Sequence, residues 1–242
     1  MNQDCSDRAF VLSRVPYRES DLILGLLCRS AGPLSVVARS ARASRRRFPG
    51  VLDFFVVFDA AWSQGRGGLP ALASAEPVRF FPGILDQLER LEAGQTMVRM
   101  VREATRDSPA SVSLFDTVVL AFGYLEQARP DLAHLVSLEL ALALATELGH
   151  APSDGVCPAC GRRAARFYVA VDGLVVCRAC CATSPGHASA LPEIYPERRP
   201  LADNPSLEAD PRMPGAAESG IMISSIVSGI TGVPWQTGPD HV

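Results

Sequence analysis

Two pairs of cysteines form the most specific chemical pattern in the sequence. Cys157 and Cys160 make one C-x2-C pair, and Cys177 and Cys180 make a second one after 16 intervening residues. Each pair can present two thiolates from a tight turn, and four thiolates at about 2.3 Å complete a tetrahedron around Zn²⁺. A closed tetrahedron leaves no position for water or substrate. We therefore predict one structural zinc ion per chain.

Alternatives to this zinc site remain open. Cys181 could replace Cys180, although its spacing from Cys177 is one residue longer and favours Cys180. Four reduced cysteines without metal are a second alternative. A catalytic zinc is disfavoured because no H-x-E motif accompanies the P-C-x-x-C pair. Five of the seven cysteines lie between 157 and 181, and the acidic N-terminus is not a secretory signal, which favours metal over disulfides.

A run of arginines is the second chemical pattern. The segment 29–50 contains six arginines and no acidic residue. Its loop offers five guanidinium groups and an aromatic ring as candidate DNA contacts: Arg39, Arg42, Arg45, Arg46, Arg47 and Phe48. Guanidinium forks bind phosphate oxygens in pairs of hydrogen bonds. The alternative for the arginines is a solvated loop, and for Phe48 it is a core anchor, which is favoured over base stacking.

The composition excludes several classes of enzyme. All 23 positively charged residues are arginine, against 26 acidic residues, so the net charge is −3 without a single lysine. A Walker A phosphate loop and a Schiff base both require lysine. The four histidines stand in no triad-like or H-E-x-x-H context, and G-x-S-x-G is absent. We predict that the protein is not an enzyme. The arginine bias itself is best explained by a GC-rich genome.

Five short apolar runs must position the basic loop. They lie at 10–15, 22–28, 34–39, 54–62 and 69–78, separated by glycine-rich breaks. Five strands within about 80 residues predict a small barrel, for which an OB-fold is favoured over an SH3-like barrel. Residues 1–80 are therefore expected to form an OB-fold DNA-binding domain.

Helical periodicity replaces the strand pattern after residue 80. Apolar residues recur at three- and four-residue spacing over 84–101 and 114–125, with Ser111 or Ser113 as the cap of the second helix. A third helix is expected over 132–148, where leucines on all sides predict central burial and Gly149 supplies the stop. These helices form the predicted helical domain, 81–150.

The remaining chain divides into a zinc module and a tail. Within 151–181, two short strands flanking Asp172 and Gly173 predict a hairpin that returns the second cysteine pair to the first. Residues 182–242 hold nine of the 19 prolines and no sustained period, which predicts a disordered tail or irregular loops. The expected fold class is α+β: an N-terminal five-stranded OB-fold barrel and a C-terminal helical domain with an inserted zinc-ribbon-like module.

An ordered series of short motifs resembles the RecO family of recombination mediators. The series covers residues 10 to about 181, roughly seven-tenths of the chain. It runs through Tyr17-x-Glu19-Ser20-Asp21, Gly32-x-Leu34, Ala38-Arg39-Ser40-Ala41-Arg42, Arg45-Arg46-Arg47-Phe48, Ser74-Ala75-Glu76, Phe81-Pro82, Glu139-Leu140, Leu148-Gly149 and the Cys157 pair. Ser40 stands where the family often has glycine. The tail departs from the family's further amphipathic helices, either because this branch has diverged or because a frameshift has replaced the C-terminus.

The resemblance implies a function in DNA repair and recombination. A member of this family binds single- and double-stranded DNA, anneals complementary strands, and works with RecR to load RecA onto strands coated by single-strand-binding protein. It implies a cytoplasmic, nucleoid-associated bacterial protein with no membrane and no small-molecule substrate. The resemblance gives the loop arginines the DNA role and the four cysteines the metal role. The alternative is a zinc-containing protein–protein adaptor without direct DNA binding.

Overall fold

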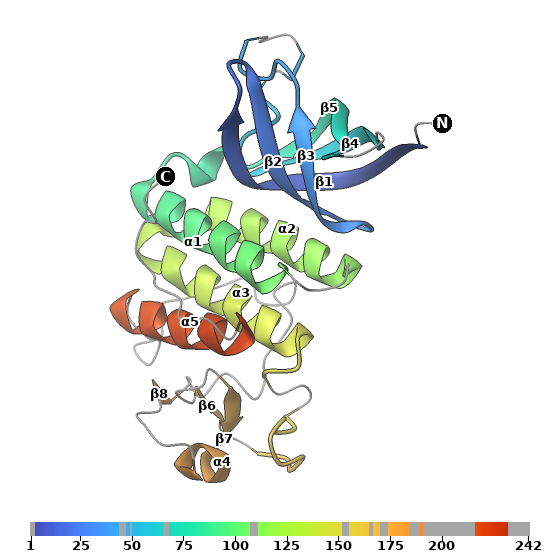
Figure 1. Ribbon diagram of the computed structural model, residues 1–242. Coiled ribbons are helices and arrows are strands. Elements are labelled where there is room, and N and C mark those ends of the chain that lie inside the picture. The colour runs from blue at the N-terminus through green and yellow to red at the C-terminus, as the bar shows by residue number, and fades with distance from the viewer. Residues whose placement is uncertain are drawn as a thin grey trace. The chain divides into compact units, whose positions relative to one another are not determined.

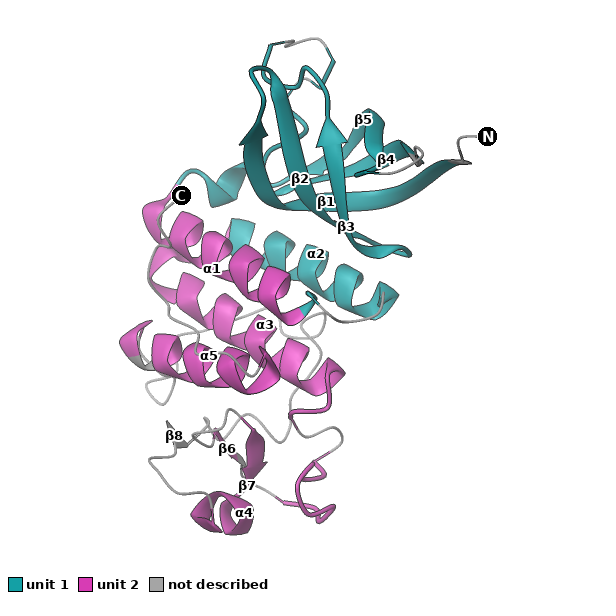
Figure 2. Ribbon diagram, viewed as in Figure 1, with its two compact units in different colours: residues 1–86, 105–126 teal, residues 87–104, 127–242 magenta. Residues whose placement is uncertain are grey.

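The chain folds into two compact units. The structure is a computed structural model that describes residues 3–43, 47–48, 50–64, 68–106, 111–151, 155–164, 167–169, 174–183, 189–190 and 216–231. Unit 1 comprises residues 1–86 and 105–126, and unit 2 comprises 87–104 and 127–242 (Figure 2). The segment 81–150, expected as one helical domain, is therefore divided between both units.

Unit 1 is built on a closed five-stranded barrel. Its strands are β1 (Gln3–Tyr17), β2 (Asp21–Cys28), β3 (Gly32–Ala38), β4 (Val56–Gln64) and β5 (Ala71–Phe80). They follow the order β1-β2-β3-β5-β4 (Figure 1). The long strand β1 closes the barrel because it pairs antiparallel with both β2 and β4, while β3 meets β5 in parallel. The predicted five-stranded OB-type fold is confirmed.

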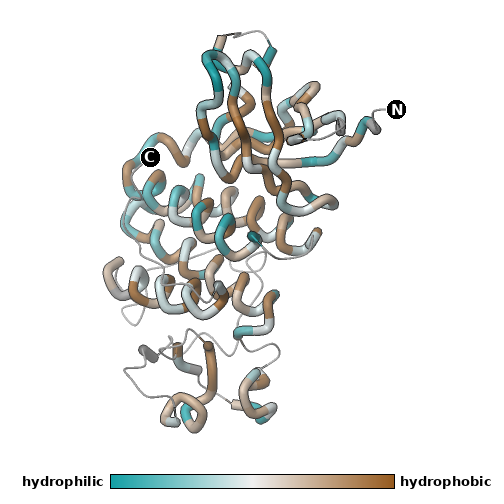
Figure 3. The backbone as a smooth tube through the Cα atoms, in the orientation of Figure 1, coloured by the Kyte–Doolittle hydropathy of each residue, from teal (hydrophilic) through white to brown (hydrophobic). Residues whose placement is uncertain are grey.

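The barrel interior is filled by alternate residues of each strand. Leu22, Leu24 and Leu26 of β2 are buried, and the residues between them are only partly covered. Val36 and Ala38 of β3 continue this buried layer. The hydropathy colouring shows apolar strands and hydrophilic segments in the loops that join them (Figure 3). Alternation with period two is what a strand with one buried face requires.

Helix α2 (Val112–Gln127) completes unit 1 by packing aromatic rings against the barrel. The ring centroids of Phe115 and Phe122 lie 5.3 and 5.4 Å from that of Phe10 on β1. Phe122 also makes edge contacts with Phe55 and Phe81. Edge-to-face clusters of this kind add to the energy of burial. Ser111 caps the helix, as predicted, because its hydroxyl accepts the Leu114 N–H at 3.1 Å.

Unit 2 contains a layer of three helices. Helix α3 (Ala133–Glu147) contacts both α1 (Leu88–Ala104) and α5 (Ala216–Thr231). Ten of the 15 residues of α3 are buried, which confirms the predicted central helix, and Gly149 follows it with φ of 80°. Short 3-10 helices at Pro82–Ile84 and Pro130–Leu132 precede α1 and α3, so α1 starts later than its apolar period suggested. None of the described helices has the length and apolarity needed to cross a bilayer.

Helix α5 corrects the prediction for the tail. Residues 216–231 were expected to lack regular structure, yet they form a helix with Met222, Ile223, Ile226 and Val227 buried. These four residues follow helical spacing and cover one face. The period was obscured because serine, glycine and β-branched residues, which are weak helix formers, dominate the segment.

The cysteine module follows α3 in unit 2. Strands β6 (Phe167–Val169) and β7 (Val175–Cys177) pair antiparallel, and β8 (Ser189–Ala190) joins the other edge of β6. Helix α4 (Arg178–Thr183) starts directly after β7. The two predicted hairpin strands are thus paired, while the turn at 172–173 lies outside the described residues.

Candidate nucleic-acid interface and metal centre

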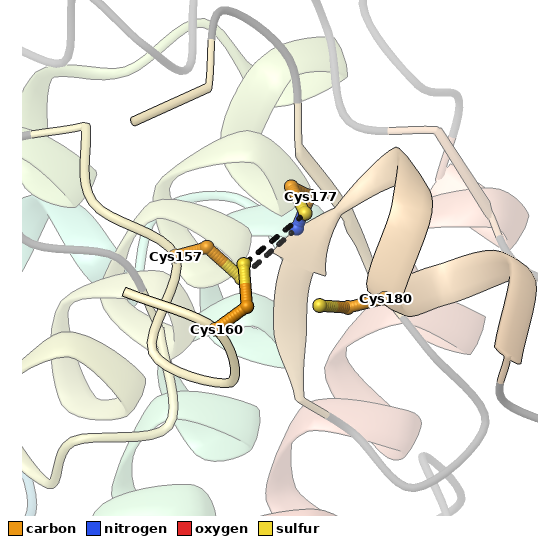
Figure 4. A group of neighbouring side chains, drawn as sticks. All are labelled: Cys157, Cys160, Cys177 and Cys180. Carbon is orange, nitrogen blue, oxygen red and sulfur yellow. Dashed lines mark hydrogen bonds between the residues drawn. The ribbon is translucent and has the colours of Figure 1, made fainter. Parts of the chain in front are cut away.

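The four predicted cysteines converge on one point. The sulfur atoms of Cys157, Cys160, Cys177 and Cys180 all lie within 4.8 Å of one another. They come from the turn at 157–160, the end of β7 and the first turn of α4 (Figure 4). Cys181, the residue after Cys180, is buried and does not belong to this group. The spacing argument for Cys180 over Cys181 agrees with this geometry.

Local backbone hydrogen bonds bring the two cysteine pairs together. The Gly161 N–H donates to the Cys157 carbonyl at 2.8 Å, which closes the first turn. A bridge between Val156 and Arg163 holds the two ends of this turn. The Cys177 N–H donates to the Cys157 sulfur at 3.4 Å and ties β7 to the first pair. The turn at 157–160 and the junction between β7 and α4 thus bring the sulfurs of the two cysteine pairs face to face.

Hydrogen bonds also shift the pKa values of Cys157, Cys160 and Cys180. Burial raises the pKa of Cys157, but N–H donors from Cys177, Cys160 and Ala159 outweigh it, so this pKa is lowered. The backbone and side chain of Arg162 lower the pKa of Cys160 to about 6. The Cys180 thiol donates to Cys160, which together with burial raises its pKa to about 12. Cys157 and Cys160 are therefore shifted toward thiolate, the form that ligates metal, whereas Cys180 is held as a thiol.

The sulfur spacing fits a tetrahedral metal ion. Zinc–sulfur bonds of about 2.3 Å place neighbouring sulfurs of a tetrahedron about 3.8 Å apart. The Cys160 and Cys177 sulfurs are 3.8 Å apart. Sulfur-only ligation with this geometry is typical of zinc or iron–sulfur sites. The four cysteines can therefore hold a metal ion, with all four positions taken by the protein.

The basic loop begins where β3 ends. Arg39 and Arg42 are exposed on the turn after Ala38, and Arg47 is exposed further along the loop. Arg45 and Arg46 lie outside the described residues. The loop lies at the same end of the barrel as the turn between β1 and β2 (Figure 1).

Phe48 anchors the hydrophobic core and is not placed to stack on a base. Its side chain is only 6% exposed and packs with Val51 and Leu52 in the barrel core. The guanidinium of Arg47 covers its ring at 5.4 Å. A buried ring cannot stack on a nucleobase, so Phe48 is removed from the candidate contacts.

The turn between β1 and β2 holds the start of the basic loop. The Asp21 carboxylate accepts the Ser40 N–H at 2.8 Å. The Arg42 N–H donates to the Ser20 carbonyl at 2.9 Å, and Arg42 Nη1 reaches the Glu19 carbonyl at 3.4 Å. Ser40 itself adopts φ of 56°, a left-handed conformation that glycine adopts more easily. The turn and the loop, 19 to 23 residues apart in sequence, are thus held together by three hydrogen bonds.

Asp21 is a positioning residue that the sequence reasoning did not single out. The available signal was its place in the Tyr17–Asp21 motif, but nothing in the sequence shows which backbone group a carboxylate accepts. The contact between Asp21 and Ser40 forms because Leu22 of β2 pairs with Ala38 of β3. That register brings Asp21 beside the residues that follow Ala38.

Arginines of unit 1 fall into two sets. Three have carboxylate partners: Arg8 pairs with Asp59, Arg14 with Asp53 and Arg29 with Asp116. Among the described residues of the loop, Arg39, Arg42 and Arg47 have no such partner. Guanidinium groups without carboxylate partners, gathered on one loop, form a surface that can bind phosphate.

These observations define a class of protein: an OB-type barrel with an open cationic loop, joined to a helical unit that carries a four-cysteine site. Two family models match consecutive parts of the chain. The model for the N-terminal part of recombination protein O matches residues 1–81, and the model for its C-terminal part matches 85–196. The chain belongs to the recombination protein O (RecO) family.

Curated relatives agree with this assignment. A DNA repair protein RecO from Anaeromyxobacter dehalogenans is 35% identical over 75% of this chain and 71% of its own. Proteins of the same name from Rubrobacter xylanophilus and Rhodopirellula baltica are each 31% identical, over 76% and 82% of this chain and 75% of their own.

Proposed function

We propose that the protein is a DNA repair and recombination mediator that binds DNA through the basic end of its barrel. The observation that carries the proposal is the set of exposed arginines without carboxylate partners among the described residues, Arg39, Arg42 and Arg47. By sequence, the same loop also contains Arg45 and Arg46. Family membership supports the same role, since the curated relatives are named DNA repair proteins.

Within this role, binding is electrostatic and independent of sequence. Guanidinium groups on a loop neutralise backbone phosphates and release counterions, so affinity falls linearly in log[salt]. Such binding serves single and double strands alike and favours annealing of complementary strands. The family resemblance further supports cooperation with RecR and loading of RecA onto strands coated by single-strand-binding protein. A cytoplasmic, nucleoid-associated location follows from these activities, which need no catalysis.

The four-cysteine site has a structural part in this function. We assign it one Zn²⁺ held by Cys157, Cys160, Cys177 and Cys180, because their sulfur spacing suits a tetrahedron. The ion cross-links a module that has three very short strands, so its binding free energy contributes to the folding of that module. With four protein ligands it offers no open position for a substrate.

A salt titration with charge-matched variants tests DNA binding. Fluorescence anisotropy of a labelled single-stranded oligonucleotide is measured between about 50 and 200 mM salt. The variant Arg39→Ala/Arg42→Ala/Arg47→Ala removes three unpaired charges from the loop. Its matched control, Arg8→Ala/Arg14→Ala/Arg29→Ala, removes the same charge from ion-paired positions of the same unit.

The loop variant is expected to flatten the slope of log K against log[salt] by about 2, at roughly 0.7 per single-strand contact. The control variant should change it far less, because its arginines already have partners. Equal slopes for both variants would reject the loop as the contact surface. Absence of binding by the unaltered protein at low salt would instead favour the adaptor function.

A further inference from the structure

We propose that the turn between β1 and β2 is a second part of the nucleic-acid site, in which Tyr17 stacks on an unpaired base and Arg18 contacts a phosphate. This inference rests on the proposed DNA binding and adds to it a preference for single strands. Tyr17 is the last residue of β1, and Arg18 is the first residue of the turn.

The turn and the basic loop are one surface. Ser20 accepts the Arg42 N–H at 2.9 Å, and Asp21 accepts the Ser40 N–H at 2.8 Å. The strand register agrees, since Tyr17 faces Asp21 across β1 and β2, and Leu22 faces Ala38 across β2 and β3. A strand of DNA bound to the loop therefore passes the turn.

Tyr17 supplies the aromatic face that the loop lacks. Phe48 is buried, whereas the Tyr17 side chain is 40% exposed at the strand end. The Arg18 guanidinium lies over the Tyr17 ring, 5.1 Å from its centroid. Single-strand binders combine aromatic rings that stack on bases with arginines that contact phosphates, and Tyr17 and Arg18 place one group of each kind side by side. Stacking requires an unpaired base, so this contact discriminates between single strands and duplex.

Charge on this surface favours an anion. The described residues of the turn and loop carry four arginines, Arg18, Arg39, Arg42 and Arg47, against two acids, Glu19 and Asp21. Asp21 is engaged with the backbone of Ser40, which leaves Glu19 as the exposed acid. Glu19 opposes binding, and its carbonyl oxygen positions Arg42. The balance remains cationic.

The test compares Tyr17→Phe with Tyr17→Leu on single-stranded and duplex DNA of the same sequence. Both variants lack the hydroxyl, but only phenylalanine keeps a ring. Tyr17→Leu should bind the single strand at least about 5-fold more weakly than Tyr17→Phe, since stacking on one base is worth that much or more. Their duplex affinities should differ by less than about 2-fold. Phe80→Leu, which removes an exposed ring from β5, is the matched control and should leave both affinities unchanged.

A crosslinking measurement gives an independent readout. An oligonucleotide containing 5-iodouracil is irradiated with the full-length protein, and the adduct is mapped by mass spectrometry. An adduct on Tyr17 supports stacking. Crosslinks only elsewhere, or equal losses on single strand and duplex, would overturn the inference while DNA binding by the unaltered protein stands. Absence of binding by the unaltered protein would reject the proposed function and this inference together.

Discussion

The four-cysteine site and the basic loop are both positioned by a backbone N–H that donates to a side chain. They differ in whether their functional side chains face one another or face solvent. In each, a backbone N–H group donates to a side-chain acceptor: Cys177 to the Cys157 sulfur, and Ser40 to the Asp21 carboxylate. The cysteine sulfurs then face one another. The described arginines of the loop face solvent, with no carboxylate partner among the described residues. A site that closes around a metal ion stabilises the fold of its own module, whereas a site that faces solvent is available to another molecule.

This difference has an energetic basis. Thiolates brought within 4.8 Å of one another repel unless a cation or protons lie between them, so the cysteine group supports its own module only when it is neutralised. Exposed arginines remain hydrated, so their separation from acids costs little stability. They contribute to DNA affinity when their binding to phosphates releases the counterions condensed on the DNA. The two regions can therefore be damaged separately, and the following predictions exploit that separation.

The largest effect is expected at the cysteines. Cys157→Ser should reduce bound zinc from about one equivalent per chain to nearly none, because a three-thiolate site loses most of its affinity and its module unfolds. Metal analysis and hydrogen exchange over 155–183 measure both changes. DNA affinity should fall less than about 2-fold, since the proposed contacts belong to the other unit.

Cys181→Ser is the matched control for this experiment. Cys181 is buried but does not belong to the ligand group, so this variant should keep its zinc. Zinc-free protein from a purification without chelators would contradict the assignment, as would retention of zinc by the Cys157 variant.

An intermediate effect on DNA affinity is expected when Asp21 is replaced. The direction of the change distinguishes a positioning role of the carboxylate from a purely electrostatic one. If Asp21 acted only as a negative charge, Asp21→Ala would strengthen DNA binding. Because its carboxylate holds the Ser40 N–H, we expect DNA affinity to fall about 3- to 10-fold, comparable to losing one ordinary hydrogen bond. Asp21→Asn removes the charge but keeps an acceptor oxygen, so it should bind more tightly than Asp21→Ala. Tighter binding by Asp21→Ala than by the unaltered protein would show that positioning is unimportant.

The sequence alone predicted those features that depend on interactions between residues close together in the chain. Short apolar runs separated by glycine-rich breaks predicted the five strands, and the spacing of the two C-x2-C pairs identified four sulfurs that the fold does bring together. Ser111 as a cap and Gly149 as a stop were readable because each acts on its own helix. In each case the partners lie within a few residues or repeat with a fixed period.

Features that depend on distant partners were harder to predict. For Phe48 a core-anchor role was favoured, but the residue also stood among the candidate DNA contacts, because its burial depends on barrel closure by strands far along the chain. Helix α5 was overlooked because its stability comes from packing against α3 and α1, not from helix propensity. The assignment of α2 to the barrel unit likewise follows from Phe10, Phe55 and Phe81, whose rings meet Phe122 only in the folded structure.

The smallest effect is expected at an arginine that already has its partner. Arg29 donates two hydrogen bonds to Asp116, and this contact lowers the pKa of the Asp116 carboxyl. A carboxyl with a lowered pKa contributes stability above its unfolded pKa of about 3.9, and the contribution disappears as the pH falls through the folded pKa. Both side chains are about half exposed, so solvent screens the pair.

Asp116→Asn should therefore lower the melting temperature at pH 7 by less than about 3 °C, and the difference should vanish in acid. A double-mutant cycle with Arg29→Gln measures the coupling of the pair directly. Neither substitution should alter the salt dependence of DNA binding as the loop arginines do, because this guanidinium is already satisfied within the barrel unit. A salt slope changed as much by Arg29→Gln as by Arg42→Ala would mean that an ion pair does not withdraw an arginine from DNA, and the distinction between satisfied and open charges would fail.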